Sequence, residues 1–250
     1  MQSQALRKGW RAFAGCLLGL AAIGLLASAP STARADTQKV KVEVTYGQPL
    51  ADKVAAIDAI EQMLEQRFRN NRYYARSYRE AGILRNTRTR FAKVKWANEL
   101  LIPDVKDYTL NHLIAAVTRY ELDRALPDFE GTVRYHIKAL KVDNHDVALL
   151  RGASSYVIGS VEVRDAKGNL VGKADDISAN LVVDYTVDNS YSGPKLAFAE
   201  TDEHNRVGPT VAWSVKKALS KVWPEHKKDF VGPIIVRISG PNEDIAYPNN

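Results

Sequence analysis

Cysteine is almost absent from this 250-residue chain, whose single example, Cys16, lies near the N-terminus. The residues after it can form no disulfide with one another and offer no thiol nucleophile. The catalytic motifs Gly-x-Ser-x-Gly, Gly-x-x-x-x-Gly-Lys-Ser/Thr and His-Glu-x-x-His are missing as well. These absences predict a protein that is not an enzyme, with no catalytic residue, no cofactor and no metal.

Two short polar loops are the places where a metal ion could still bind. Residues 143–146 read Asp-Asn-His-Asp, and residues 200–204 read Glu-Thr-Asp-Glu-His. Each loop puts oxygen ligands beside a histidine, but neither has the spacing of a known site. Metal binding by these loops, and a hydrolase built on residues 200–204, remain alternatives that the sequence does not decide.

Long hydrophobic runs are limited to Cys16–Leu26, which is shorter than the roughly 20 residues that span a bilayer. This run follows three cations and precedes Ala33-Arg34-Ala35, with small residues at the −3 and −1 positions. The pattern predicts a signal peptide over residues 1–35, cleaved after Ala35, with an uncleaved N-terminal anchor as the alternative. Cys16 precedes the apolar run, whereas the cysteine of a lipoprotein signal follows it. We therefore expect Sec-dependent export to a bacterial periplasm, or secretion, and no transmembrane segment after cleavage.

Acidic residues are nearly missing from one segment, although the chain as a whole is close to neutral once residues 1–35 are removed. Removal of residues 1–35 takes away four cations and no acid, which leaves 31 cations and 29 acids. Residues 67–95 contain ten of these cations and one acid, Glu80, with aromatic residues between them. Spaced arginines with aromatics are typical of surfaces that bind phosphate or anionic lipid. The predicted partner-binding residues are Arg67, Arg69, Arg72, Tyr73, Tyr74, Arg76, Tyr78, Arg79, Arg85, Arg88, Arg90 and Trp96.

Two other interpretations of this basic segment remain open. Its arginines can form a solvated face that pairs with acidic residues of the same chain, as charge runs usually do. They can also dock on the acidic part of a second copy. The oligomeric state and the order of the segment on its own are not predictable from the sequence.

Alternating hydrophobic residues predict four strands, and a short, largely apolar run predicts a fifth. Three of them are consecutive, and the residues Asp165–Asn169 supply a tight hairpin between the second and third of these. The predicted strands are Lys39–Tyr46, Thr132–Val142, Tyr156–Ala166, Asp176–Val187 and Ile234–Ile238.

Helical periodicity predicts three helices, Ala51–Arg67, a second that is capped by Asp107 or Thr109 and runs through Leu126, and Pro209–Trp223. In the first helix the side chains expected to face the core are Val54, Ile57, Ile60, Met63/Leu64 and Phe68, with Asp58, Glu61 and Glu65 on the solvent side. Lys93–Lys106 is expected to be a connector with room for a short strand. Asp188–Val207 is expected to be a long loop.

These elements predict one α+β domain over residues 36–240. The expected architecture is a mostly antiparallel sheet of about five strands with two to three helices packed on one face. Residues 67–106 form a basic insert or connector within it, and residues 241–250 a flexible tail.

The helix end Ala125-Leu126 and the hairpin sequence Tyr156–Val171 resemble a pattern in small exported bacterial proteins of uncharacterised-domain families. There, a helix ending in Ala-Leu leads to a strand and then to a Gly-x-Val-x-Val-x-Asp-x-x-Gly hairpin. The resemblance implies a periplasmic accessory of envelope assembly or transport, and it supplies no functional residue.

The favoured hypothesis is a non-enzymatic periplasmic accessory protein that docks on an envelope protein, an anionic glycan or an anionic lipid through Arg67–Trp96. No nucleic-acid partner is expected in that compartment. The alternative is a carrier or sensor of a small molecule or lipid. Such a ligand would bind between the sheet and the helices, with residues 188–207 as a lid.

Overall fold

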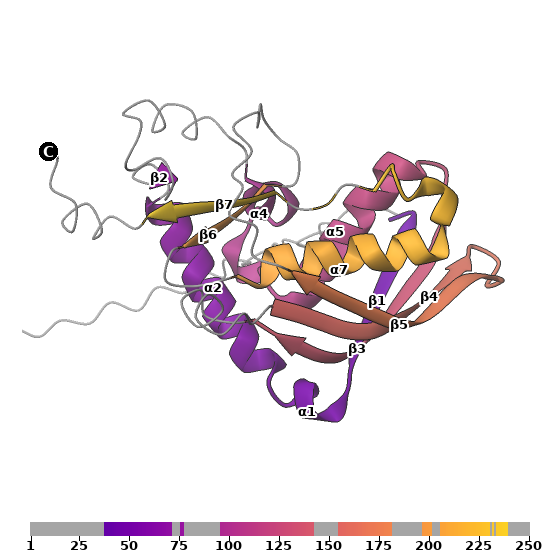
Figure 1. The fold of residues 1–250 in the computed structure, drawn as a ribbon, viewed down its shortest axis with the longest axis horizontal. Coiled ribbons are helices and arrows are strands. Elements are labelled where there is room, and N and C mark those ends of the chain that lie inside the picture. The colour runs from indigo at the N-terminus through magenta and orange to yellow at the C-terminus, as the bar shows by residue number, and fades with distance from the viewer. Residues whose placement is uncertain are drawn as a thin grey trace, which may run out of the picture. The chain divides into compact units, whose positions relative to one another are not determined.

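The structure, a computed structural model, describes residues 38–71, 76–77, 96–142, 155–181, 197–201, 206–230, 232 and 234–239. The predicted signal peptide, the loop 143–146 and the tail 241–250 lie outside these residues. The helical elements are α1 Gln48–Ala51, α2 Val54–Asn71, α4 Ala97–Leu101, η2 Val105–Asp107, α5 Leu110–Ala125, α7 Val207–Val222 and η3 Pro224–His226. The strands are β1 Val40–Tyr46, β2 Arg76–Ser77, β3 Gly131–Lys141, β4 Ser155–Asp165, β5 Leu170–Leu181, β6 Ala197–Thr201 and β7 Ile234–Ser239 (Figure 1).

The main sheet has the strand order β1-β3-β4-β5 and confirms the predicted α+β class. β3, β4 and β5 form an antiparallel meander, whereas β1 pairs in parallel with β3, with Val42 opposite Val133. A parallel pair needs a long crossover, which the helices between β1 and β3 provide. The sheet is therefore mixed and has four strands, and the expectation of about five strands in one mostly antiparallel sheet is corrected in this respect.

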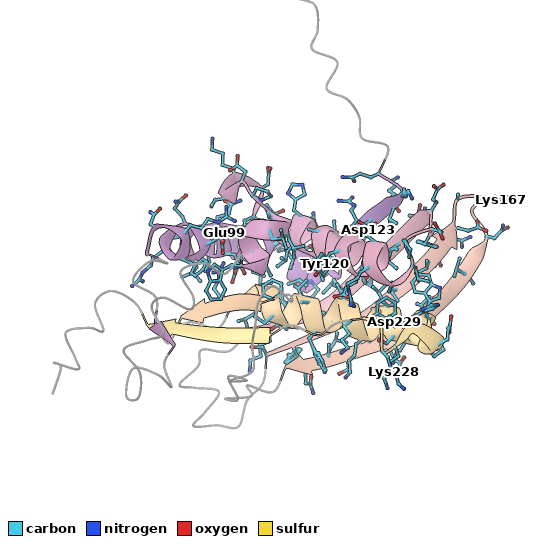
Figure 2. The ribbon with its side chains drawn as sticks, turned by 90° about the horizontal axis from the view of Figure 1, so that it is seen from above. Glu99, Tyr120, Asp123, Lys167, Lys228 and Asp229 are labelled. Atoms are coloured by element: carbon cyan, nitrogen blue, oxygen red, sulfur yellow. The ribbon has the colours of Figure 1, made fainter. Side chains whose placement is uncertain are left out.

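The β4–β5 hairpin turns at the predicted residues. Gly168 adopts a φ of 85°, which is easily accessible to glycine. The Asp165 carboxylate accepts hydrogen bonds from the backbone N–H groups of Lys167 and Asn169 at 2.9 and 2.8 Å. Because this turn is tight, β5 begins at Leu170, six residues before the predicted start at Asp176. Figure 2 shows Lys167 at the tip of the hairpin, directed away from the sheet.

Helices α5 and α7 lie on one face of the sheet and pack against each other (Figure 1). The sheet contributes the inward side chains predicted from alternation, among them Val133, Tyr135, Val161 and Val163, all at most 3% exposed. The Thr109 hydroxyl accepts the His112 N–H at 3.3 Å and so caps α5. Burial of these apolar faces provides the main driving force for this part of the fold.

A second, three-stranded sheet was not predicted. It has the order β2-β7-β6, and it contains the predicted final strand as β7. β6 lies within residues 188–207, where a loop was expected, so that expectation is wrong for residues 197–201. Phe198 of β6 is fully buried, and a Cβ on Gly208 would come within 2.7 Å of its ring. This close approach lets α7 begin directly against β6.

The connector before α5 is helical. Residues 97–101 form α4 and residues 105–107 form η2, so the short strand allowed for in Lys93–Lys106 does not occur within the described residues 96–106. Pro103 separates the two turns, in accordance with the restriction that proline places on the residue before it.

Candidate functional site

Helix α2 is rotated about its axis relative to the sequence-based expectation. Glu61 and Glu65 are 7% and 0% exposed, whereas Ile60 and Met63 are 54% and 62% exposed. The prediction that Glu61 and Glu65 face solvent and that Ile60 and Met63 face the core is therefore wrong. Leu64 and Phe68 are buried as predicted. The reason for the rotation is a set of polar partners that receives the two glutamates.

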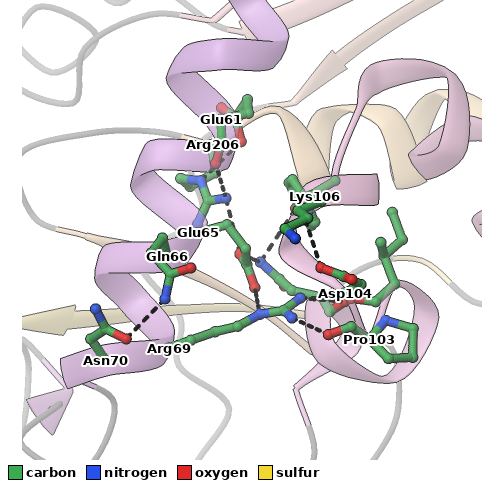
Figure 3. A network of polar contacts seen from close by, with 12 residues as sticks. Glu61, Glu65, Gln66, Arg69, Asn70, Pro103, Asp104, Lys106 and Arg206 are labelled. Atoms are coloured by element: carbon green, nitrogen blue, oxygen red, sulfur yellow. Dashed lines mark hydrogen bonds and ion pairs between the residues drawn. The ribbon is translucent and has the colours of Figure 1, made fainter. Parts of the chain in front are cut away.

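Arg206, the residue that precedes α7, is the main partner of both glutamates (Figure 3). Its Nε donates to Glu61 Oε2 at 2.9 Å, and Nη2 donates to Glu65 Oε2 at 3.0 Å. The backbone N–H of Val207 donates to Glu61 Oε1 at 3.1 Å. A carboxylate at the start of α7 thus satisfies a free helical N–H and interacts favourably with the helix dipole.

Arg69 and Asn98 complete the contacts of Glu65. Arg69 Nε donates to Glu65 Oε1 at 2.7 Å, one helical turn away, and Asn98 Nδ2 donates to Glu65 Oε2 at 2.7 Å. The Arg69 guanidinium also donates to the Ile102 carbonyl at 2.7 Å and to that of Pro103. Figure 3 shows Arg69 directed from α2 towards the turn that contains Pro103.

Tyr108 contacts two members of this network, Arg206 through its aromatic ring and Asn98 through its hydroxyl group. The Arg206 guanidinium lies 5.5 Å from the centre of this ring, and Asn98 Nδ2 is 3.3 Å from the Tyr108 hydroxyl oxygen. Burial raises the pKa of Tyr108 above its ordinary value. Burial alone would lower the pKa of Arg206, but Glu61, Tyr108 and Glu65 together raise it above the ordinary value. Arg206 therefore stays charged.

We call Glu61, Glu65, Arg69, Asn98, Tyr108 and Arg206 the charge clamp. Its two glutamates and two arginines balance in formal charge, and both oxygens of each glutamate accept hydrogen bonds. Carboxylates held in this way are already engaged as acceptors, unlike a poised general base, which must be able to reach a substrate proton. The clamp is therefore suited to fixing elements in place: it joins α2, α4, the turn after α4 and the start of α7.

The clamp holds both ends of the basic segment. Arg69 lies near the start of the segment, two residues before the end of α2. Asn98 lies in α4, three residues after the end of the segment. Next to these two residues, Trp96 packs edge-on against Phe68, with ring centres 5.6 Å apart and an interplanar angle of 87°. β2 within the segment also pairs with β7, with Arg76 opposite Ser239. The start of the segment and the residues that follow its end are thus held together by one buried cluster.

The predicted partner-binding residues fall into three groups. Arg67 is exposed on α2, and Arg76 lies in β2. Arg69 belongs to the clamp, and Trp96 is 2% exposed in the core. The others lie outside the described residues: Arg72, Tyr73, Tyr74, Tyr78, Arg79, Arg85, Arg88 and Arg90.

A polar groove runs along the clamp between α2 and the turn after α4. It has a volume of about 580 Å³ and is open to solvent. Its lining includes Gln62, Gln66, Arg69, Pro103, Asp104, Val105 and Lys106. Gln62 already donates to the Lys106 carbonyl at 3.0 Å, and Gln66 donates to Asn70 at 2.9 Å.

The space between the sheet and helices α5 and α7 bears on the carrier hypothesis. The apolar cavity there is lined by Leu110, Ile114, Tyr135, Val215 and neighbouring residues and measures about 10 Å³. That volume is about enough for one water molecule, whereas ligand pockets measure roughly 300–1,000 Å³. Among the described residues, the packing between sheet and helices does not favour a bound lipid.

The structure describes only part of the two loops that the sequence left open as alternative metal sites. Within the described residues no group of three or more histidine, cysteine, aspartate or glutamate side chains could hold a metal ion. Glu200 and Thr201 are in β6, and residues 143–146 and 202–204 lie outside the described part of the chain. No helix in the described ranges is long and apolar enough to cross a membrane.

Sequence analysis missed the clamp because its members are far apart in the chain. Residues 61 and 206 are separated by 145 positions, and no local motif connects them. One signal was available in α2. Val54, Ile57, Ile60 and Met63 repeat every three residues, and at 100° per residue each step falls 60° short of a full turn. Four such residues cover half of the helix circumference, so they could not all have faced the core.

Comparisons of the chain with models of known protein families, with curated proteins and with solved structures gave no match. The function must therefore be argued from the clamp, the segment that it holds and the surface next to them.

Proposed function

We propose that this chain is a non-enzymatic, exported accessory protein that docks on an anionic component of the cell envelope through its basic segment, residues 67–95. The single observation that carries the proposal is that residues at both ends of this segment contact one buried side chain. Arg69 near its start and Asn98, three residues after its end, contact the same buried carboxylate, that of Glu65. A binding element that is anchored at both ends loses less conformational freedom when it engages a partner.

The charge of the segment supports the same proposal. Of its ten cations, Arg69 is used by the clamp, and the segment contains one acid, Glu80. A cluster of cations of this size attracts anionic surfaces over a distance of about 8–10 Å at physiological salt. Arginine also forms paired hydrogen bonds with phosphate and carboxylate groups, which lysine does not match.

The proposal can be tested by affinity capture from detergent-solubilised envelope. The bait is the chain from Asp36, compared with a variant in which Arg72, Arg76, Arg79 and Arg85 are changed to glutamate. We expect the unmodified protein to capture its partner at low salt, to lose it at high salt, and to lose it in the variant.

A matched control separates a local surface from a general effect of net charge. Lys138, Lys167, Lys227 and Lys228 are exposed on the sheet, the hairpin and the residues after η3. Changing these four lysines to glutamate alters the net charge by the same amount as the arginine variant. Capture should survive in this control, and equal capture by all three proteins would contradict the proposal.

A further inference from the structure

The outward face of α2 is free of acids. Its exposed side chains are those of Ala55, Ala56, Ala59, Ile60, Met63, Gln66, Arg67 and Asn70. Ile60 and Met63 are among the most exposed large apolar side chains in the described part of the protein. The helix thus presents alanine, isoleucine and methionine along most of its length, and its cation lies near the end that leads into the basic segment.

All three acids of this helix point the other way. Glu61 and Glu65 are in the charge clamp, and Asp58 accepts the backbone N–H of Leu110 at 2.7 Å. Burial of a carboxylate is unfavourable unless buried partners compensate for it, whereas a carboxylate on the solvent side of a helix needs no partner. The arrangement therefore gives the helix an outward face on which no negative charge is placed.

An acid-free apolar face that continues into arginines fits an anionic lipid surface. Helices that lie in the membrane interface combine an apolar stripe with cations, and they bind through buried apolar area together with attraction to anionic lipids. The aromatic residues Tyr73, Tyr74 and Tyr78 of the basic segment are of the type enriched at the head-group level. A helix of 18 residues is about 27 Å long, which gives an extended contact along the surface.

We propose that the outward face of α2, with Ile60 and Met63 at its centre, inserts into the head-group region of an anionic lipid bilayer beside the basic segment. This inference rests on the proposed function and names the partner of the docking surface as a membrane rather than a protein. The arginines supply the attraction to the lipid phosphates, and the apolar face supplies the insertion.

The test uses the chain from Asp36 and sedimentation with vesicles. Vesicles of phosphatidylcholine with phosphatidylglycerol are compared with vesicles of phosphatidylcholine alone. We expect binding to the anionic vesicles, and a loss of about tenfold in affinity when Ile60 and Met63 are both changed to glutamine, because two apolar side chains no longer insert. The matched control changes Ile158 and Leu170, which are 39% and 56% exposed on β4 and β5, to glutamine and should bind as the unmodified protein does.

A spectroscopic readout shows insertion directly. The chain from Asp36 contains no cysteine, so Met63→Cys can be labelled with a polarity-sensitive fluorophore at one position. Its emission should shift to the blue on anionic vesicles, and that of a label at Ile158→Cys should not. An unshifted label at position 63, or equal vesicle binding by both glutamine variants, would overturn the inference.

Failure of this inference differs from failure of the proposed function. A protein that binds no vesicle, but that captures an envelope protein in a way that depends on Arg72, Arg76, Arg79 and Arg85, would overturn the membrane proposal and leave docking intact. A protein that neither binds vesicles nor captures a partner would contradict both.

Discussion

Two regions of the molecule bury side chains of different kinds. The first region is the main sheet with helices α5 and α7, and the second is the junction of α2, α4 and the start of α7. In the first region the inner residues are mainly valine, leucine, isoleucine and alanine, with Val117, Val163 and Leu219 fully buried, and few polar or charged side chains such as Thr118 and Glu121 are buried with them. In the second region Glu65 and Arg206 are buried to the same extent. Most of the first region needs apolar surfaces of the right shape, whereas the second needs particular partners at particular distances.

This difference has a consequence for the surface. Apolar packing directs apolar side chains inward and leaves a polar exterior. The charge clamp instead draws acids inward on α2, and Ile60 and Met63 are left on the outside. The clamp therefore contributes specificity, because it fixes the rotation of a helix whose apolar residues alone would allow more than one face to be buried.

The largest expected effect comes from removing the central cation of the clamp. Arg206→Met leaves Glu61 and Glu65 buried beside an apolar group and should lower the free energy of unfolding by about 3–5 kcal/mol. Urea unfolding measures the change. Arg134→Met is the matched control, because Arg134 pairs with Glu43 at 2.7 Å but has a half-exposed side chain, and it should cost below about 1 kcal/mol.

A triple variant distinguishes loss of charge balance from loss of packing. When Glu61 and Glu65 are changed to glutamine together with Arg206→Met, no unpaired charge is left among these three residues. We expect this variant to be more stable than Arg206→Met alone, as replaced ion pairs often are. A triple variant that is less stable than the single one would contradict the electrostatic explanation.

A core substitution tests the other side of the comparison. Leu219→Ala removes a fully buried side chain from α7 and should cost about 2–4 kcal/mol through lost transfer energy and a cavity. Leu219 and Arg206 are 13 residues apart, about 20 Å along the helix, so the two losses should add within about 0.5 kcal/mol in the double variant. A strong interaction energy would mean that the two regions are not independent.

The cap of α5 should have a smaller effect. Thr109→Ala removes the hydroxyl that accepts the His112 N–H, and we expect a loss of about 1 kcal/mol in urea unfolding. Thr109→Ser keeps the acceptor and should be close to the unmodified protein. Equal losses in both variants would show that the methyl group, and not the cap, is responsible.

The smallest effects concern the pH dependence of two carboxylates. Burial, as the largest influence, raises the pKa of Asp58, so the folded state binds the Asp58 proton more tightly than the unfolded state does. The contribution of Asp58 to stability therefore falls as the pH rises from about 3.8 to the raised pKa. In Asp58→Asn this decline is absent, and the stability of the variant relative to the unmodified protein should increase over that range.

Asp176 provides the opposite case. A hydrogen bond from Lys221 lowers the pKa of Asp176, so its contribution is present above 3.8 and is lost as the pH falls towards the lowered pKa. The relative stability of Asp176→Asn should therefore decrease as the pH rises over that range. Urea unfolding between pH 2.5 and 7 gives both slopes, and equal signs would contradict the account.

Much of the fold could be predicted because local patterns determine it. Alternation in residues 131–165 predicted which side chains of β3 and β4 face the core, and Gly168 predicted the hairpin. The parallel pairing of β1 with β3 and the strand β6 could not be predicted, because each depends on partners far away in the chain. β6 has five residues, too few for alternation to distinguish a strand from the polar loop around it.

The sequence predicted the basic segment next to the candidate site but not the charge clamp itself. The excess of cations in residues 67–95 is visible in the composition, but the burial of Trp96 and the role of Arg69 depend on contacts with Phe68 and Glu65. Arg206 stands alone in a polar stretch, and nothing near it in the sequence indicates that it is buried. Buried charges need partners, and sequence patterns do not identify partners over long separations.

The central claim is that the charge clamp turns the acids of α2 inward and its apolar residues outward, and thiol labelling tests this most directly. In the cysteine-free chain from Asp36, single cysteines replace Met63 and Leu64, neighbours that are 62% and 5% exposed. We predict that the thiol at position 63 reacts in the folded protein nearly as fast as in denaturant, and that the thiol at position 64 reacts far more slowly until the protein unfolds. Fast labelling at position 64 and slow labelling at position 63 would contradict the account.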